Sequence, residues 1–263
     1  MNDDLNLNFI ALLTDFGVQD YFVGAMKGAV LSINPNARIV DITHEIEPQN
    51  VAAASFTLRA CYKNFPVKTI FVAVVDPGVG SNRKAILVET RNYFFIAPDN
   101  GLLSFVFDKE NDYTVFELTN EKFTAQSVGA TFHGRDVFAP VAAHLSKGVP
   151  PDSFGERTEN YVRLRENKPR QTSNDKIEAE IIHADRFGNL ITNLTGDELP
   201  DNFTLQINET TISRRRSFFA EAEPGEVFMI VGSAGFLEIA AFRDSAKRLL
   251  DAEVGQKIIV TNS

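Results

Sequence analysis

The N-terminal part of the chain alternates short apolar segments with segments of helical periodicity, and this alternation restricts the fold more than any other feature. Phe9–Leu13, Arg38–Ile42 and Thr69–Val75 have the short, β-branched character of buried strands. Between them, Tyr21–Ile33 and Val51–Tyr62 carry apolar residues at helical spacing. Because strand and helix alternate, we predict an α/β domain with a mostly parallel sheet between helices.

The same domain continues with further elements in a less regular order. Ala85–Glu89 and Tyr93–Ala97 are predicted to be adjoining strands, and Val115–Leu118 a further strand. Gly101–Phe107 and Val137–Leu145 are predicted to be helices.

A change in the pattern of polar and apolar residues marks a second domain. From Arg163 to Asp175 the chain is polar and charged and has no apolar periodicity, which indicates a linker. Beyond it lie short apolar runs separated by turn residues: Ile177–Ile182, Phe203–Ile207, Val227–Val231, Phe236–Ala241 and Ile258–Val260. Such runs are typical of a small sandwich or barrel. We therefore predict an α/β domain over residues 1–165, a linker over 166–175 and an all-β, barrel-like domain over 176–263.

Composition excludes several classes of function. A formal net charge of -9 opposes binding to a nucleic-acid backbone, and the basic cluster Arg214–Arg216 is expected to be a solvated segment. With Cys61 as the sole cysteine and four scattered histidines, we expect no disulfide and no metal site. No apolar run is long enough for a membrane span, and the acidic Met1–Asp4 differs from a signal peptide. We expect a cytoplasmic protein with neither nucleic acid nor membrane as a partner.

The segment Val74–Arg83 places an acid, Asp76, and a base, Arg83, around a glycine-rich turn. Asp76 follows a predicted strand directly, at the carboxyl edge where open α/β sheets bind ligands. A purely structural turn is the alternative, because Asp-Pro-Gly is common turn chemistry. A dinucleotide or P-loop site fits less well, since Gly78-Val79-Gly80 lacks a third glycine and no Gly-Lys-Ser/Thr follows.

Two further polar motifs lie beside elements of the first domain. Thr14–Gly17 follows the first predicted strand, so Asp15 is expected on the same sheet edge as the acid of the glycine-rich turn. Thr131–Asp136 leads into the last predicted helix of this domain, and its His133 is expected in a cleft. The alternative is that Asp136 caps this helix and His133 has no function.

Two loops of the second domain carry similar side chains. Asp185–Asn189 offers a carboxylate, the ring of Phe187 and the amide of Asn189, which can read a base edge. As a plain hairpin turn, the same loop needs only its glycine and asparagine. Glu238, in the motif Gly232–Glu238, interrupts an apolar run, where a carboxylate requires solvent or a cationic partner.

Together, these motifs resemble those of one family, the S-adenosylmethionine hydroxide adenosyltransferases, also called S-adenosylmethionine hydrolases. The motifs follow in order along nearly the whole chain, up to Glu238: Thr14-Asp15-Phe16-Gly17, Ile42-Thr43-His44, Val75–Gly80, Pro98-Asp99-Asn100-Gly101, Thr131–Asp136 and Asp185–Asn189. The resemblance implies a two-domain subunit with an α/β N-terminal and a β-barrel-like C-terminal domain. It also implies a homotrimer with active sites at the subunit interfaces, each between the N-terminal domain of one subunit and the C-terminal domain of its neighbour.

The reaction implied by the resemblance is attack of water on C5′ of the substrate S-adenosylmethionine, which releases adenosine and methionine. A sulfonium is an excellent leaving group, so neither a metal nor another cofactor is expected. Water has a pKa of about 15.7, and its attack is helped by a base and by nearby positive charge. By motif, Asp76 orients or deprotonates the water, Arg83 stabilises its developing negative charge, and His133 completes the hydrogen-bond network.

The family motifs also imply the residues that bind the substrate. Asp15 accepts hydrogen bonds from the ribose hydroxyls, Phe187 stacks on adenine, and Asn189 reads the adenine edge. Three further residues are assigned to the amino-acid end, with the last facing its ammonium group: Asp185, Ser233 and Glu238.

Related halogenases, which bind fluoride or chloride in place of water, are one alternative. They carry Tyr at the position of Asp76 and Tyr followed by a small residue in place of His133-Gly134, and they have an extra loop that this chain is too short to contain. A carboxylate facing the nucleophile repels a halide and suits water. A non-catalytic adenosine or S-adenosylmethionine sensor is another alternative, which would need Asp15 and Asn189 but not the water-activating residues together.

Overall fold

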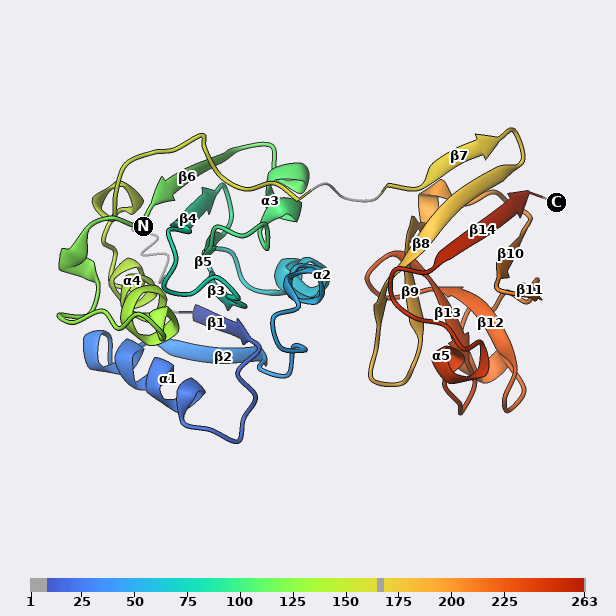
Figure 1. The fold of residues 1–263 in the computed structure, drawn as a ribbon, viewed down its shortest axis with the longest axis horizontal. Coiled ribbons are helices and arrows are strands. Elements are labelled where there is room, and N and C mark those ends of the chain that lie inside the picture. The colour runs from blue at the N-terminus through green and yellow to red at the C-terminus, as the bar shows by residue number, and fades with distance from the viewer. Residues whose placement is uncertain (1–8, 165–167, 263) are drawn as a thin grey trace, which may run out of the picture. The chain divides into compact units, whose positions relative to one another are not determined.

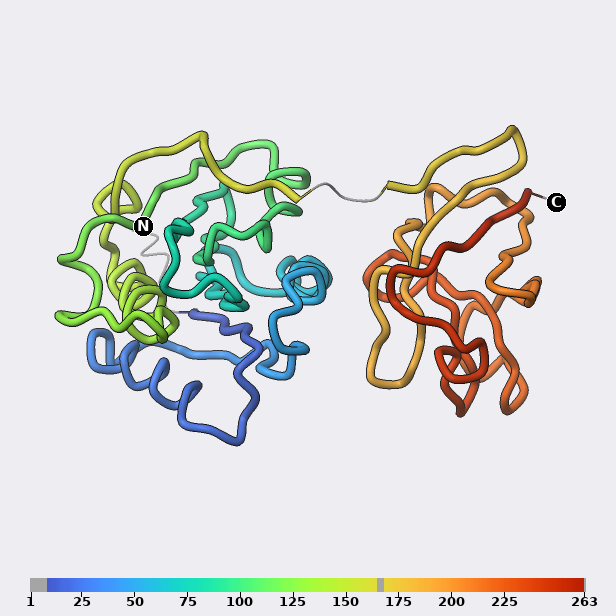
Figure 2. Tube along the Cα trace, in the orientation of Figure 1, coloured from blue at the N-terminus to red at the C-terminus, as the bar shows by residue number. Residues whose placement is uncertain are grey.

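The computed structural model describes residues 9–164 and 168–262, which belong to two compact units divided between residues 165 and 166. Each unit is one continuous stretch of chain, blue to yellow-green for the first and yellow to red for the second (Figure 2). The acidic Met1–Asp4 and residues 166–167 of the predicted linker lie outside the described residues.

The first unit contains a six-stranded sheet in the order β2-β1-β3-β5-β4-β6. Its strands are β1 (Phe9–Thr14), β2 (Arg38–Thr43), β3 (Ile70–Val74), β4 (Ala85–Thr90), β5 (Phe94–Pro98) and β6 (Tyr113–Glu117). Strands β2, β1, β3 and β5 pair in parallel, whereas β4 is antiparallel to both β5 and β6. The mostly parallel sheet confirms the predicted α/β class.

Helices cover both faces of this sheet, because its central strands are apolar on both sides. In β1, Ile10 and Leu12 belong to one buried cluster and Ala11 and Leu13 to the other. The first cluster includes side chains from α1 (Phe22–Ile33) and α4 (Ala139–Ser146), which lie side by side in Figure 1. The second includes side chains from α2 (Val51–Cys61) and α3 (Ser104–Lys109).

Local chemistry sets the helix boundaries. Asn50 caps α2, since its side chain accepts a 2.9 Å hydrogen bond from the Ala53 amide. The predicted helix at residues 137–145 begins instead as a π-helical turn, Gly134–Phe138, which continues into α4. Short 3-10 turns complete the described helical residues: Tyr62–Asn64, Glu121–Phe123, Pro151–Ser153, Gly196–Glu198 and Phe219–Glu221.

The second unit is an antiparallel sheet that approaches a barrel, in the order β11-β10-β14-β8-β9-β13-β12, with β7 also paired to β8. Its strands are β7 (Arg170–Ser173), β8 (Lys176–Ala184), β9 (Leu190–Thr195), β10 (Phe203–Ile207), β11 (Thr210–Ile212), β12 (Val227–Val231), β13 (Phe236–Ala241) and β14 (Lys257–Asn262). One short helix, α5 (Ala246–Leu249), is its only α-helix in the described residues. The all-β prediction for this unit is confirmed.

Two short strands carried no apolar signal. β7 is exposed along its whole length and falls within the stretch predicted as a linker, yet it pairs with β8. β11 is three residues long, with only Ile212 buried. Across both units, none of the helices in the described ranges has the length and apolar character needed to cross a membrane.

Candidate active site

The carboxyl edge of the first sheet has a switch point between β1 and β3. From β1 the chain moves to β2 on one side, and it then returns to β3 on the other side. In open α/β sheets, ligands bind in the crevice at such a point. Asp15 follows β1 and Asp76 follows β3 after Val75, so the two acids flank the switch point.

Asp76, Arg83 and His133 meet at this edge, and we call them the polar triad. Arg83 donates from Nε to both carboxylate oxygens of Asp76 at 3.0 Å, and from Nη2 to Oδ2 at 2.5 Å. The same Nη2 lies 2.7 Å from Nδ1 of His133. The side chains of Asp76 and Arg83 are only 5% and 11% exposed, so solvent screens their charges little. The glycine-rich segment does form a turn, since the Val79 amide donates to the Asp76 carbonyl. The same turn carries two members of the triad, Asp76 and Arg83.

The hydrogen-bond pattern fixes the protonation of His133. A guanidinium has only donors, so Nδ1 of His133 must accept, and the neutral ring carries its proton on Nε2. Burial and the neighbouring Arg83 charge lower the pKa of His133, against the opposite effects of Asp76 and Asp136. The imidazole therefore stays neutral to lower pH than an ordinary histidine.

The turn that follows His133 is a π-helical turn, an irregularity frequent at functional sites. Asp136 lies inside this turn and is 2% exposed. Its carboxylate accepts hydrogen bonds from the Gly129 amide at 2.8 Å and from Arg135 at 2.6 Å. The alternative that Asp136 caps the helix is thus wrong, because its oxygens bind other groups.

Gly80 allows the glycine-rich turn to pack against the segment before His133. Its φ is +78°, and a Cβ added there would lie 2.4 Å from the Ala130 carbonyl oxygen. Gly148 also has a positive φ, of +87°, but an added Cβ would meet nothing within 4 Å.

This difference predicts the effect of alanine at the two positions. Gly148→Ala should cost about 1–2 kcal/mol for the left-handed backbone alone. Gly80→Ala should lower the free energy of unfolding by about 1–3 kcal/mol more, because the backbone must also move away from Ala130. Urea denaturation of both variants measures the difference. Equal losses would show that the contact with Ala130 contributes nothing.

Asp15 is held by a loop that follows β2. Its Oδ2 accepts a 2.8 Å hydrogen bond from the Gln49 amide. Gln49 has a φ of +67°, an uncommon conformation for a residue other than glycine, and this orients its N–H toward the carboxylate. No feature of the sequence indicated Gln49.

In the second unit, Asp185–Asn189 is the hairpin loop between β8 and β9. Oδ1 of Asp185 accepts from the amides of Phe187 and Asn189 at 2.9 and 2.8 Å, and its Oδ2 accepts from the Asn189 side chain at 2.8 Å. The loop is therefore a hairpin turn that also fixes the side-chain amide of Asn189. Asn189 is 5% exposed, whereas Phe187 is 78% exposed.

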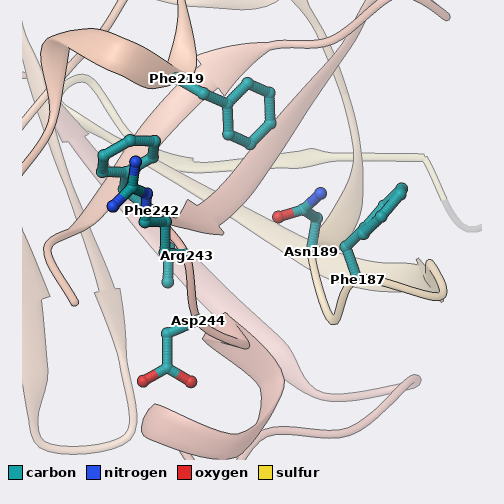
Figure 3. Close-up of a pocket in the computed structure, with 7 residues that line it drawn as sticks. Phe187, Asn189, Phe219, Phe242, Arg243 and Asp244 are labelled. Atoms are coloured by element: carbon teal, nitrogen blue, oxygen red, sulfur yellow. The ribbon is translucent and has the colours of Figure 1, made fainter. Parts of the chain in front are cut away.

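A pocket of about 520 Å³ opens beside this loop (Figure 3). Phe187 and Asn189 line it from the loop, and Phe219 and Phe242 line it from other segments of the same unit. The remaining lining residues are Ala241, Arg243 and Asp244. Sequence reasoning missed Phe219 and the residues at the end of β13, although two consecutive phenylalanines, Phe218 and Phe219, after a polar stretch were a usable signal.

Glu238 and Ser233 lie near the β12–β13 turn. Glu238 approaches the backbone of Gly232 so closely that an added Cβ there would lie 1.8 Å from its Oε1. Burial, together with the charge of Asp185, raises the pKa of Glu238. Ser233 is exposed in the turn. A cation that binds beside Glu238 would stabilise the charged form of this half-buried carboxyl group.

The predicted site residues thus fall into two groups, one in each unit. The triad and Asp15 belong to the first unit, and the remaining five belong to the second: Asp185, Phe187, Asn189, Ser233 and Glu238. No group of three or more His, Cys, Asp or Glu side chains that could hold a metal ion occurs in residues 9–164 or 168–262.

Comparisons with known proteins agree across most of the chain. Residues 10–155 match the SAM hydroxide adenosyltransferase N-terminal domain, and residues 179–259 match the C-terminal domain of the same family. An (R)-S-adenosyl-L-methionine hydrolase of Methanocaldococcus jannaschii is 38% identical, over 96% of this chain and 95% of the relative. A crystal structure of an uncharacterized conserved protein from Thermotoga maritima has a TM-score of 0.91 at 37% identity, covering 96% of this chain and 100% of that one. A fluorinase of Actinopolyspora mzabensis is 24% identical over all of both chains.

Proposed function

The chain belongs to the SAM hydroxide adenosyltransferase family, and we propose that it is an (R)-S-adenosyl-L-methionine hydrolase that forms adenosine and L-methionine. The polar triad carries this proposal, since it places a carboxylate, a cation and a neutral imidazole together at a ligand-binding sheet edge. Oxygen of water attacks C5′, and the C5′–S bond breaks with its electron pair moving to sulfur. Methionine leaves as a neutral thioether, and the water gives up one proton.

The triad geometry supports the following roles in activating water. Asp76 orients or deprotonates the water with its carboxylate. Arg83 stabilises the hydroxide-like charge that develops on oxygen, and it holds both Asp76 and His133 in place. His133 offers its Nε2 proton to the hydrogen-bond network, because its Nδ1 accepts from Arg83.

The second group and Asp15 are proposed to bind the substrate. The exposed ring of Phe187 and the fixed amide of Asn189 line a pocket suited to adenine. Asp15 accepts from the ribose hydroxyls. The amino-acid end is assigned to Asp185, Ser233 and Glu238, and the raised pKa of Glu238 favours pairing with the methionine ammonium.

Incubation with S-adenosylmethionine in ¹⁸O-labelled water tests the reaction. The R and S sulfonium epimers are supplied in separate incubations. From the R epimer, we expect adenosine with the label in its 5′-hydroxyl and methionine in equal amount. An Asp76→Asn preparation run in parallel controls for contaminating enzymes. Unchanged substrate at high enzyme concentration would contradict the hydrolase and favour a sensor.

Two observations favour the hydrolase over the halogenase alternative. Asp76 places a 5% exposed carboxylate in the proposed nucleophile pocket, where it would repel a halide. The fluorinase alignment spans 301 positions against 263 residues here, so the fluorinase carries insertions that this chain lacks. A 5′-halo product that depends on added fluoride or chloride would reverse this assignment.

The protonation of His133 predicts a pH dependence. Its lowered pKa keeps the ring neutral above and slightly below the ordinary value of 6.5, so kcat/KM should be constant there. As pH falls further through the lowered pKa, Nδ1 gains a proton and can no longer accept from Arg83, and kcat/KM should decline. A pH profile from 4.5 to 8 measures this. A decline that begins clearly above pH 6.5 would contradict it.

We propose that the enzyme is a cytoplasmic homotrimer with active sites at the subunit interfaces. The division of the site residues between two units supports shared sites. Light scattering should give three times the 29.2 kDa of one chain, and cell fractionation tests the location. A monomeric mass for an active enzyme would exclude the trimer.

A further inference from the structure

A chain of polar side chains, buried at its inner end, begins at the residue that precedes Asp15. Thr14 and His44 are 0% and 4% exposed, and Oγ1 of Thr14 lies 2.8 Å from Nδ1 of His44. On the other side of the ring, Nε2 of His44 lies 3.2 Å from Oδ1 of Asp41. The second oxygen of Asp41 accepts a 2.6 Å hydrogen bond from Lys27. Burial of the Thr14 hydroxyl and the His44 ring costs free energy, whereas Lys27 and Asp41 are 33% and 40% exposed. The water-activating triad uses none of these side chains.

The hydrogen-bond partners of Thr14 and His44 allow one consistent order of donors and acceptors. Oγ1 of Thr14 accepts from the Phe16 amide at 3.2 Å, which leaves the hydroxyl proton for Nδ1 of His44. When Nδ1 of His44 accepts this proton, a proton on Nε2 faces the carboxylate of Asp41, which can only accept. Nε2 of His44 makes no hydrogen bond in the part of the chain that the structure describes, so its contact with Asp41 across 3.2 Å is electrostatic.

This chain fixes the backbone on both sides of Asp15. Thr14 immediately precedes Asp15, and the Thr14 hydroxyl holds the amide of Phe16, which follows it. The Gly17 amide donates to the His44 carbonyl at 2.7 Å, which ties the same turn to the end of β2. The carboxylate of Asp15, in this same turn, accepts a hydrogen bond from the amide of Gln49.

We propose that Thr14 and His44 are positioning residues for substrate binding, which hold the Asp15 carboxylate in the orientation that receives the ribose. They act through Asp15 and touch no substrate themselves. The inference rests on the proposed function, because it takes adenosine as the ligand of Asp15.

A double-mutant cycle on adenosine affinity, measured by calorimetry, tests the inference. Thr14→Val keeps the size of the side chain and removes its hydroxyl, and it should raise the Kd for adenosine about tenfold, the effect of one lost hydrogen bond. Thr14→Ser restores the hydroxyl and should return the Kd to within about twofold of the wild type. In an Asp15→Ala background, Thr14→Val should have no further effect, since the group it positions is absent.

The kinetic readout separates positioning from loss of folded protein. Thr14→Val should raise KM for S-adenosylmethionine and leave kcat nearly unchanged, whereas partial unfolding would lower the active fraction and leave KM as it was. If Thr14→Val does not fold, a second pair serves. His44→Asn keeps an acceptor for the Thr14 hydroxyl and His44→Leu removes it, so only the leucine variant should raise the Kd about tenfold.

Failure of the inference and failure of the proposed function give different results. Equal effects of Thr14→Val with and without Asp15 would overturn the inference, as would a normal Kd in Thr14→Val when Asp15→Ala binds weakly. An unchanged Kd in Asp15→Ala itself would instead contradict the ribose role of Asp15 and, with it, the inference built on that role.

Discussion

Asp76→Asn is expected to lower kcat by about 10²- to 10⁴-fold, the range that a positioned acid or base contributes. The substitution keeps the shape of the side chain but removes its charge, so water is no longer polarised, and the buried guanidinium of Arg83 loses its counter-ion. The Kd for adenosine should change far less than kcat, because the triad meets only the 5′-hydroxyl of the nucleoside, while the base and the other ribose hydroxyls bind elsewhere. Product formation at saturating substrate and calorimetry with adenosine measure the two quantities.

A matched control separates this effect from a general change of charge. Asp112→Asn makes the same substitution at an exposed residue of the same unit and should leave kcat unchanged. His133→Ala should lower kcat strongly, as Asp76→Asn does, because both residues bind the same guanidinium. Near-normal rates in both Asp76→Asn and His133→Ala would remove the triad from water activation.

Asp15→Ala should weaken adenosine binding by about 10- to 100-fold while kcat changes much less. A hydrogen bond to a charged group contributes about 1.5–3 kcal/mol, which corresponds to one to two powers of ten in Kd. The carboxylate is held by the Gln49 amide on one oxygen, which leaves acceptor capacity for the ribose hydroxyls. Calorimetry with adenosine measures the loss.

The ligand provides the control for this prediction. With 2′,3′-dideoxyadenosine the hydroxyls are absent, so wild type and Asp15→Ala should bind with Kd values that differ by less than about threefold. If Asp15→Ala weakens both ligands equally, Asp15 contacts another part of the nucleoside or supports the fold. An unchanged Kd for adenosine would exclude the ribose role altogether.

The sequence was a good guide to the fold where burial left a periodic signal. β1 and β3 are buried on both faces and show as continuous apolar runs, and the parallel sheet follows from the helices between them. β7 left no such signal, because it is held by backbone pairing to β8 with all its side chains exposed. Backbone hydrogen bonds do not depend on side-chain polarity, so a polar edge strand resembles a linker.

The site divides in the same way. Sequence and family motifs singled out Asp76, Arg83 and His133, but Arg83 and His133 are 50 residues apart, and only the fold brings their nitrogens to 2.7 Å. That contact assigns the His133 proton to Nε2. The assignment depends on which donor faces which ring atom, and spacing along the chain does not contain this information.

By itself, the sequence determined the two domain classes, the family and the residue types available for chemistry, because apolar periodicity and ordered motifs are local properties. Only the tertiary structure decided which polar groups form hydrogen bonds with one another. It showed that Gln49 binds Asp15, that Asp136 binds Gly129 and does not cap a helix, and that Thr14 and His44 form a buried chain. Buried polar atoms must find partners wherever the packed chain supplies them, so these pairings follow from the three-dimensional arrangement and not from neighbours in the sequence.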